Sequence, residues 1–345
     1  MLIKLQRSLS GAELRITKTQ YHGGNARLPD LIKKYWFLIG LLLVFAVTVG
    51  DTSETVSGIG RWFKMHGGPD TVIVLVFFLS GLRLNVWQIK SGLMDIKGIV
   101  IALIIIFIVA PATAAFIGLV PLDTGIIIGI FLVAVMPTTL SSGVVMTGAA
   151  GGNMAHALVI TVFANGLAVF TIPFILSLLL NLVGGTAVVS IDKLAIMIKL
   201  LFLVLLPLFI GLTVKYYTKS FIEPFIPKLA RANECLILVM VWMGMSQARD
   251  AILGSVELVG IVFLLVFGFH GILLATAGLF TVLLKLGKGR RESVIFMGGQ
   301  KTLPLSVILQ VSLFPQYGIA LVVCVMHHMV HLLMDGYLVG KLKSD

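Results

Sequence analysis

Runs of about twenty apolar residues recur along this chain, and they restrict its fold more than any other feature. Three of them are YWFLIGLLLVFAVTVG at 35–50, IVIALIIIFIVAPATAAFIGLV at 99–120 and LAIMIKLLFLVLLPLFIGLTV at 194–214. A helix needs about 20 such residues to cross the hydrocarbon core of a bilayer. The alternating pattern of a membrane barrel strand is missing from these runs. We therefore predict an all-α polytopic membrane protein.

The composition supports this prediction. Of the 345 residues, 58% are hydrophobic and only 12% are charged, and the mean hydropathy of +1.07 is far above that of soluble domains. Ten apolar segments can be placed on the chain. Their approximate bounds are 32–50, 70–85, 96–120, 123–148, 153–180, 192–216, 232–250, 256–284, 292–311 and 317–340.

The distribution of charge predicts the orientation. With ten spans, most of the 26 Lys and Arg residues fall on one side of the membrane, which also carries both termini. Cytoplasmic loops are enriched in such residues, so we expect a multi-pass protein of the cell membrane with both termini cytoplasmic. The net charge of +11 is better explained by contact with anionic lipid than with nucleic acid. No apolar signal-peptide core precedes the first span, and the N-terminal segment is interpreted as a basic surface tail.

The spans divide into two similar halves. We expect a tail at 1–30, a first five-helix repeat at 31–180, a linker at 181–191, a second five-helix repeat at 192–342 and a short tail at 343–345. Because five is odd, the second repeat starts on the opposite side of the membrane, and the repeats are predicted to be inverted.

The fourth span of each half contains helix-breaking and polar residues. The first reads VAVMPTTLSSGVVMTGAAGG and the second VIFMGGQKTLPLSVILQ. Proline removes a backbone donor and glycine eases departure from helical geometry, so both spans are predicted to be discontinuous. Thr302 resembles an N-cap with Pro304 in the following first turn, and Ser141 or Ser142 could cap the other half-helix. Unwound backbone inside a membrane protein must line a cavity or protein surface, which points to a substrate site here.

Motifs of soluble catalysis are missing. The sequence contains no nucleophile elbow, Walker sequence or HExxH motif, so we expect no enzyme activity. A channel or an intramembrane enzyme remains an alternative of another class. Cys235 and Cys324 lie in separate apolar runs and form no disulfide or metal pattern.

His327, His331 and Asp335 share one face of the last span at four-residue spacing. Such a face could bind a transition metal or relay protons. Because Lys341 follows only six residues later, the favoured interpretation is an interfacial network with lipid or cytoplasmic loops. His156 and His270 are each expected to be hydrogen-bonded contacts between helices.

Four motifs together resemble those of the bile acid:sodium symporter family, in particular its SBF-like branch. They are FFLSGLRL, APATAA, MPTTLSSGVVMTGAAGGN and GGQKTLPLSVIL, and the resemblance covers nearly all of the chain after residue 30. It implies ten helices in two inverted repeats whose discontinuous fourth and ninth helices cross. It also implies transport of an organic anion, bile-acid-like or another carboxylate, together with sodium by alternating access. No cofactor is expected beyond a possible sodium ion, and the oligomeric expectation is a monomer or weak dimer.

The resemblance transfers only partly to individual residues. Where the family has Ser-Asn at the fourth-helix crossing, this chain has Ser142 and Gly143. The family's ninth-helix glutamate corresponds to Phe296, and a third-helix glutamine corresponds to Ile106. The expected ion-binding residues are Ser141, Ser142, Gly143, Thr161, Asn165 and Gln300.

Lys301, Thr302, Thr138 and Thr139 are expected to serve coupling or substrate binding. Three roles are open for Lys301. Its ammonium could replace a sodium ion by donating to carbonyls at the helix break, which would make transport sodium-independent or proton-coupled. It could instead bind the acid group of the substrate, or it could extend to the interface or pair with an acidic residue purely for structure.

Overall fold

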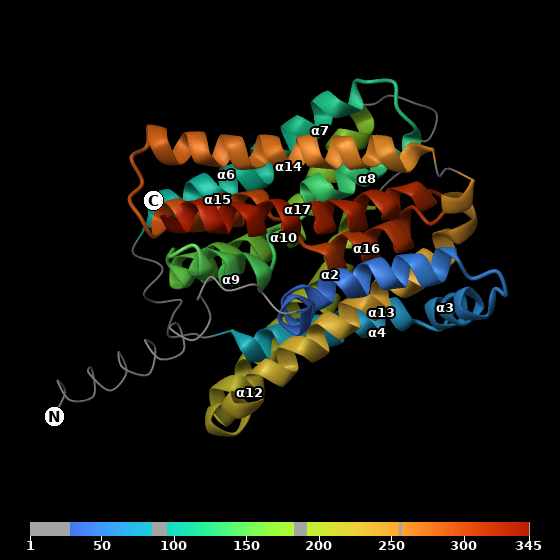
Figure 1. Ribbon diagram of the computed structural model, residues 1–345, viewed down its shortest axis with the longest axis horizontal. Helices are drawn as coiled ribbons and strands as arrows, with labels where there is room; N and C mark the ends of the chain where they lie inside the picture. Colours follow the sequence, from blue (N-terminus) through green and yellow to red (C-terminus); the bar gives the residue numbers. More distant parts are fainter. Residues whose placement is uncertain (1–27, 85–94, 183–191, 255–256, 345) are drawn as a thin grey trace. The chain divides into compact units, whose positions relative to one another are not determined.

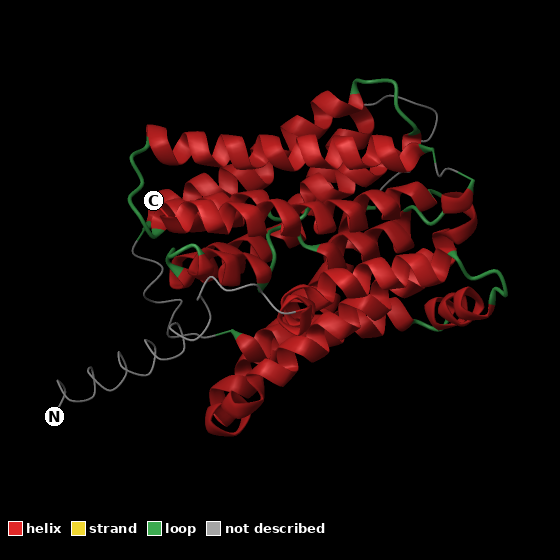
Figure 2. Cartoon of the chain, viewed as in Figure 1, coloured by secondary structure: helices red, strands yellow, loops and turns green. Residues whose placement is uncertain are grey.

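The computed structural model describes residues 28–84, 95–182, 192–254 and 257–344, and within these ranges the regular structure is entirely helical (Figure 2). Nearly all of the predicted tail at 1–30 and of the linker at 181–191 lies outside the described residues. Contacts divide the chain into two compact units, 1–40 and 41–345. All of the packing and site geometry that follows lies within 41–345.

The first half of the chain contains these elements (Figure 1): α2 Leu28–Val49, α3 Thr55–Met65, α4 Gly68–Arg83, α6 Ile96–Ile104, η1 Ile105–Val109, α7 Ala110–Gly118, α8 Thr124–Val135, α9 Ser142–Ala149 and α10 Met154–Leu182. The second half contains α11 Lys193–Leu200, η2 Leu201–Leu205, α12 Leu206–Ile222, η3 Glu223–Phe225, α13 Ile226–Leu253, α14 Leu258–Leu283, α15 Arg290–Gly299, α16 Leu303–Leu313 and α17 Gly318–Ser344.

Two of the long helices change their hydrogen-bond pattern in the middle. The segments η1 and η2 are single π-helical turns, and each leads directly into a helix with proline in its first turn, Pro111 in α7 and Pro207 in α12. Proline has no N–H to donate, so the preceding turn widens instead of continuing regular α-helical bonding. Carbonyls at such a turn become available to other donors.

The ten predicted apolar segments overlap helices of the described residues, and two of them, 123–148 and 292–311, contain a non-helical stretch, at 136–141 and 300–302. By length and composition, six helices of the described residues can cross a membrane, or seven if the pair α3 and α4, bent by 76°, is counted as one. Sequence reasoning missed α3. This helix carries Arg61 and Lys64 among its apolar residues, so it lacks the continuous apolar run from which the spans were predicted.

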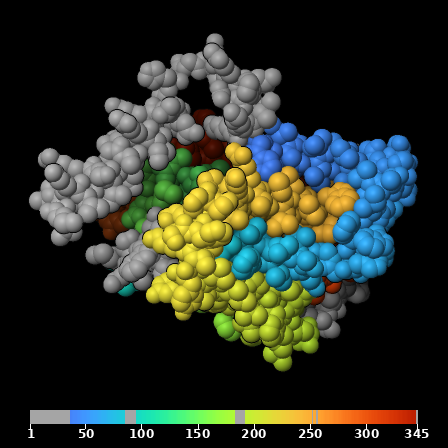
Figure 3. Space-filling view, turned by 90° about the horizontal axis from the view of Figure 1, so that it is seen from below, coloured from blue at the N-terminus to red at the C-terminus, as the bar shows by residue number. Residues whose placement is uncertain are grey.

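Helix α17 packs against α8, α13, α14 and α16, and Figure 1 shows it running beside α14. Helix α4 packs against α12 and α13, which Figure 3 shows in yellow to orange next to α4 in light blue. The contact between α4 and α12 depends on Gly81 and Gly211, because a Cβ atom on either would overlap a carbonyl oxygen of the other helix, that of Leu208 or Phe78. Small residues permit this close approach of helix backbones.

Candidate functional site

Both predicted helix breaks are present. Helix α8 ends at Val135 and α9 begins at Ser142, while α15 ends at Gly299 and α16 begins at Leu303. Thr302 is the N-cap residue of α16 with Pro304 in the first turn, and Ser141 is the N-cap residue of α9, which confirms both predictions. The two breaks contact each other directly, since the backbone N–H of Thr302 donates to the carbonyl of Pro137 at 2.9 Å.

A cluster of hydroxyl and amide groups joins the breaks. The Oε1 atom of Gln300 accepts hydrogen bonds from the hydroxyls of Thr139 at 2.7 Å and Ser142 at 2.9 Å. The Ser142 hydroxyl also lies 2.9 Å from the Thr139 hydroxyl, which accepts from the backbone N–H of Gly143 at 3.0 Å. The sequence-predicted residues from the two halves therefore meet in space. They form a compact set of oxygens, although Gln300 is about 160 positions from Thr139 and Ser142 in the chain.

Helix α10 contributes two more of the predicted residues. The Thr161 hydroxyl donates to the carbonyl of Thr139 at 3.2 Å, and Nδ2 of Asn165 donates to the carbonyls of Thr138 at 3.2 Å and Thr161 at 2.9 Å. The Oδ1 atom of Asn165 and the hydroxyl of Thr138 are buried without a hydrogen-bond partner. Buried oxygens of this kind normally have a partner. They are the atoms here with free capacity to bind a cation.

Lys301 is fully enclosed, with 2% of its surface exposed, so the interpretation that it reaches the interface is wrong. Its ammonium donates to three backbone carbonyls, those of Ile106 at 2.9 Å, Ala134 at 3.0 Å and Met136 at 2.9 Å. Ala134 and Met136 lie where α8 ends, and Ile106 lies in the π-helical turn η1. The predicted donation to carbonyls freed by a helix break occurs, and two of the three carbonyls belong to the α8/α9 break in the first half of the chain.

The histidine and aspartate residues of α17 are not interfacial, contrary to the favoured sequence interpretation. The side chains of His327, His331 and Asp335 are buried. Asp335 interacts with Nε2 of His270 at 3.0 Å and accepts from Nε2 of Gln300 at 2.7 Å, which ties it to the helix breaks. Interior packing of α17 against α14 is the reason: it places this face toward the protein instead of toward lipid. Among the described residues, no group of three His, Cys, Asp or Glu side chains is arranged to hold a metal ion.

Asp335 places a carboxylate next to the helix breaks, which the sequence alone did not indicate. Phe296, at which the sequence resemblance placed the family's ninth-helix glutamate, is buried in an apolar cluster with Ile105 and Ile295. No sequence signal linked α17 to the break. Asp335 nevertheless holds the amide of Gln300 so that its oxygen faces Thr139 and Ser142. His270 is the predicted hydrogen-bonded contact between helices, from α14 to Asp335 on α17. Sequence reasoning marked both residues but missed that they pair with each other and adjoin the helix breaks. His156 is the expected contact between helices, 2.6 Å from the Ser293 hydroxyl.

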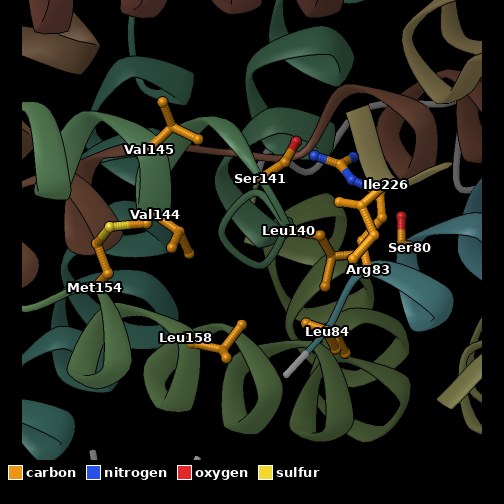
Figure 4. Close-up of a pocket in the computed structure, with 10 residues that line it drawn as sticks. All are labelled: Ser80, Arg83, Leu84, Leu140, Ser141, Val144, Val145, Met154, Leu158 and Ile226. Carbon is orange, nitrogen blue, oxygen red and sulfur yellow. The ribbon is translucent and has the colours of Figure 1, made fainter. Parts of the chain in front are cut away.

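A cavity of about 160 Å³ adjoins the α9 end of the crossing. Figure 4 shows its wall, in which Ser80, Arg83 and Ser141 supply polar groups and Leu84, Leu140 and Leu158 supply apolar surface. Helices α4, α9, α10 and α13 all contribute to this wall. Arg83 and Ser80 were not predicted as site residues, because they precede the first break by more than fifty positions and only the packing of α4 brings them near it.

Crossed, non-helical backbone surrounded by buried polar groups is the architecture of a secondary transporter. Comparison with known families agrees: the SBF-like CPA transporter family matches residues 35–344, and this chain belongs to that family. It is therefore a multi-pass membrane transport protein and not an enzyme.

Individual relatives resemble the chain over most of its length. Sodium/bile acid cotransporter 7 of Xenopus tropicalis is 27% identical over 334 residues, which are 92% of this chain and 94% of that protein. The protein named Probable sodium/metabolite cotransporter BASS4, chloroplastic, of Arabidopsis thaliana is 29% identical over 280 residues, which are 77% of this chain and 64% of that protein. Sodium/bile acid cotransporter 7 of Gallus gallus is 24% identical over 329 residues, 92% of this chain and 93% of its own.

Proposed function

We propose that this chain is a secondary active transporter that carries an organic anion by alternating access with sodium coupling. One observation carries the proposal: the α8/α9 break and the α15/α16 break meet at Pro137 and Thr302 and enclose a buried cluster of oxygens. Two breaks in contact form a discontinuity around which one half of a transporter can move against the other. The names of the relatives, which include sodium, bile acid and metabolite cotransport, support the same activity.

The proposed architecture has ten spans in two inverted five-helix repeats, at 31–180 and 192–342. The spans would be α2, α4, α6 to α7, α8 to α9 and α10 in the first repeat, then α11 to α12, α13, α14, α15 to α16 and α17 in the second. In this arrangement the discontinuous helices are the fourth and the ninth. Both termini would lie in the cytoplasm, the basic loops would contact anionic lipid, and the protein would act as a monomer or weak dimer.

Sodium is a hard cation that prefers several oxygen ligands. The oxygens of Thr138, Thr139, Ser142, Thr161, Asn165 and Gln300 supply such a set, and two of them are buried without a partner. Ser141 and Gly143 would shape the backbone around the ion. Asp335 adds a negative charge behind Gln300, which supports binding of a cation although no carboxylate reaches the oxygens themselves.

The alternative is sodium-independent or proton-coupled transport, in which Lys301 replaces a sodium ion. It is favoured by the three carbonyls that surround the Lys301 ammonium, because this is the coordination that a dehydrated monovalent cation would receive. In that case the Lys301 ammonium, at the α15/α16 break of the ninth span, would be hydrogen-bonded to both α8 and η1. Within this alternative, Lys301 has a structural and coupling role rather than binding substrate, since its ammonium is already enclosed by carbonyl oxygens.

The first test measures transport by the full chain in proteoliposomes. Counterflow of radiolabelled taurocholate and of smaller carboxylates distinguishes a carrier from a channel, because only a carrier exchanges labelled for unlabelled substrate without a net gradient. We expect counterflow that an inward sodium gradient accelerates. Absence of counterflow for every anion in the panel, with an intact protein, would contradict the proposed function.

The second test addresses sodium directly. Sodium chloride should raise the melting temperature of the protein more than potassium chloride does, because a ligand that binds only the folded state stabilises it. Thr139→Val should abolish the difference. Thr113→Val is the matched control, since Thr113 makes a similar bond to the carbonyl of Val109 at 2.9 Å in α7 but has no place in the oxygen cluster. Equal effects of the two salts on the unmodified protein would favour the alternative with Lys301.

A further inference from the structure

The cavity beside the crossing has a polar wall and an apolar wall, and neither takes part in the hydrogen bonds of the oxygen cluster. Arg83, at the end of α4, and Ser141, the N-cap residue of α9, are half-buried members of the polar wall. The Ser141 hydroxyl makes no capping bond to α9. Its hydrogen-bonding capacity is therefore not used by the helix that it precedes.

Among the described residues, the charged groups that interact with Arg83 and Lys215 leave an excess of one positive charge near the cavity. Lys215 on α12 is 3.3 Å from the carbonyl of Arg83, and Glu234 on α13 lies within electrostatic range of Arg83. Lys219 and Glu223 lie within range of Lys215 and offset each other. Arg83, Lys215 and Glu234 together thus favour a ligand with a single negative charge.

The remaining wall is apolar and the volume is small. Leu84, Leu140, Val144, Leu158 and Ile226 line it. A cavity of about 160 Å³ is smaller than the roughly 300–1,000 Å³ of sites that enclose a drug-sized ligand. It suits a short aliphatic or aromatic acid, or the acidic end of a larger molecule, and does not enclose a whole sterol.

We infer that this cavity is the anion-binding site, in which the Arg83 guanidinium and the Ser141 hydroxyl bind the acid group of an amphipathic monoanion. The Ser80 hydroxyl lines the same wall but donates to the carbonyl of Val76 at 2.7 Å. The inference rests on the proposed transport of an organic anion and specifies where and how the anion binds. Guanidinium presents two parallel N–H groups that match a carboxylate or sulfonate, which a lysine ammonium cannot reproduce. The leucine side chains contact the hydrocarbon part.

Binding is tested on the full chain in nanodiscs with three probes that have the same five-carbon tail: hexanoate, pentanesulfonate and the uncharged hexanamide. In the wild-type protein the two anions should bind more tightly than the amide. Arg83→Gln should weaken the anions by about 10- to 100-fold and leave hexanamide unchanged, so that the discrimination by charge disappears. Arg83→Lys should give an intermediate loss. Arg61→Gln is the control, because Arg61 pairs with Glu54 at an exposed site at 3.3 Å.

A second measurement does not require substitution of Arg83. In a Cys235→Ser background, which removes the exposed native thiol, Ser141→Cys should be alkylated slowly in the presence of hexanoate and rapidly with hexanamide. Ser53→Cys, at an exposed loop position, should be unaffected by either probe. Nanodiscs with phosphatidylglycerol in place of phosphatidylcholine distinguish the source of the anion: protection by the lipid alone identifies a lipid headgroup, and protection by hexanoate alone identifies a soluble acid.

The outcomes separate this inference from the proposed function. Discrimination between hexanoate and hexanamide that survives in Arg83→Gln, or alkylation of Ser141→Cys that hexanoate does not slow, would overturn the inference even if transport occurs. Charge-dependent binding that is lost in Arg83→Gln would support it even if no anion is exchanged across the membrane, in which case only the transport proposal fails.

Discussion

Replacement of Lys301 by methionine removes the buried ammonium and keeps most of the side-chain volume. Three carbonyls, those of Ile106, Ala134 and Met136, then lose their donor. An unsatisfied buried acceptor costs about 1–3 kcal/mol, so the total loss is roughly 3–9 kcal/mol. Removal of the buried charge offsets part of this loss, because an ammonium inside apolar surroundings is itself unfavourable by about 3 kcal/mol on insertion scales. The two terms leave roughly 0–6 kcal/mol, and we expect a net destabilisation near the middle of this range, about 3 kcal/mol.

The assay is thermal unfolding of the purified protein in detergent, followed by tryptophan fluorescence. A loss of that size corresponds to a fall in melting temperature of roughly 5–10 °C for a large domain. Lys199→Met is the matched control. Lys199 is also a lysine within an apolar helix, but it is partly exposed and contacts Ser312 at 2.9 Å and Asp70 at 3.3 Å. Exposed pairs contribute about 0–1 kcal/mol, so the control should shift the melting temperature little.

A second variant tests whether Lys301 acts as a cation or only fills space beside the carbonyls. Lys301→Ala leaves space beside the three carbonyls, whereas Lys301→Met fills it. Sodium should therefore stabilise the alanine variant more than the methionine variant, by about 1.4 kcal/mol at a concentration ten times the dissociation constant. A methionine variant as stable as the wild-type protein, or equal responses of both variants to sodium, would refute the role of Lys301 as a built-in cation.

Three further outcomes are expected. Gly81→Ala should lower stability by about 1–3 kcal/mol in thermal unfolding, because its Cβ atom would overlap the Leu208 carbonyl. Gly166→Ala is the control and should be neutral or slightly stabilising, because Gly166 has open space around it. Similar losses of stability in both variants would contradict the close contact between α4 and α12. The backbone N–H of Ser57 donates to Asp51 at 2.9 Å and lowers the pKa of that carboxyl from 3.8 to about 2. The stability that ionised Asp51 provides is therefore present above pH 4 and lost as the pH falls toward 2. Asp51→Asn should accordingly be less stable than the wild-type protein at pH 6 but nearly equal to it near pH 2, and a constant difference between these pH values would count against this bond. Asn165→Leu should weaken stabilisation by sodium, because Oδ1 of Asn165 has no partner in the protein and is free to bind the ion. It should also lower stability in potassium, because the carbonyl of Thr138 loses the N–H that Asn165 donates. Unchanged stabilisation by sodium would remove Asn165 from the proposed ion site.

The sequence by itself determined the helical class, the positions of the apolar helices and the two breaks. Each of these follows from local chemistry. Apolar runs of sufficient length form helices, and proline, glycine and hydroxyl residues interrupt them wherever they occur, as at Pro137 and at Gly298 to Pro304. Sequence also marked Lys301, Gln300 and Ser142, because polar residues within apolar segments are conspicuous without any knowledge of their neighbours.

Only the tertiary structure decided which partners these residues have. Lys301 is bonded to carbonyls of η1 and α8, more than 160 positions away, and carbonyls carry no sequence signature because every residue has one. Asp335 was expected at the interface from its distance to Lys341 along the chain. The packing of α17 against α14 instead places it beside His270 and Gln300.

Arg83, in the wall of the cavity beside Ser141, shows the same limit. In the sequence it is one of several basic residues that follow a span, and the charge rule that assigns orientation treats all of them alike. The close contact between Gly81 and Gly211 fixes the position of α4 against α12, and this position brings the end of α4 to the cavity beside Ser141. Local patterns determine helices and their interruptions, but the side chains that share a site are selected by helix packing, which depends on the surfaces of all the helices together.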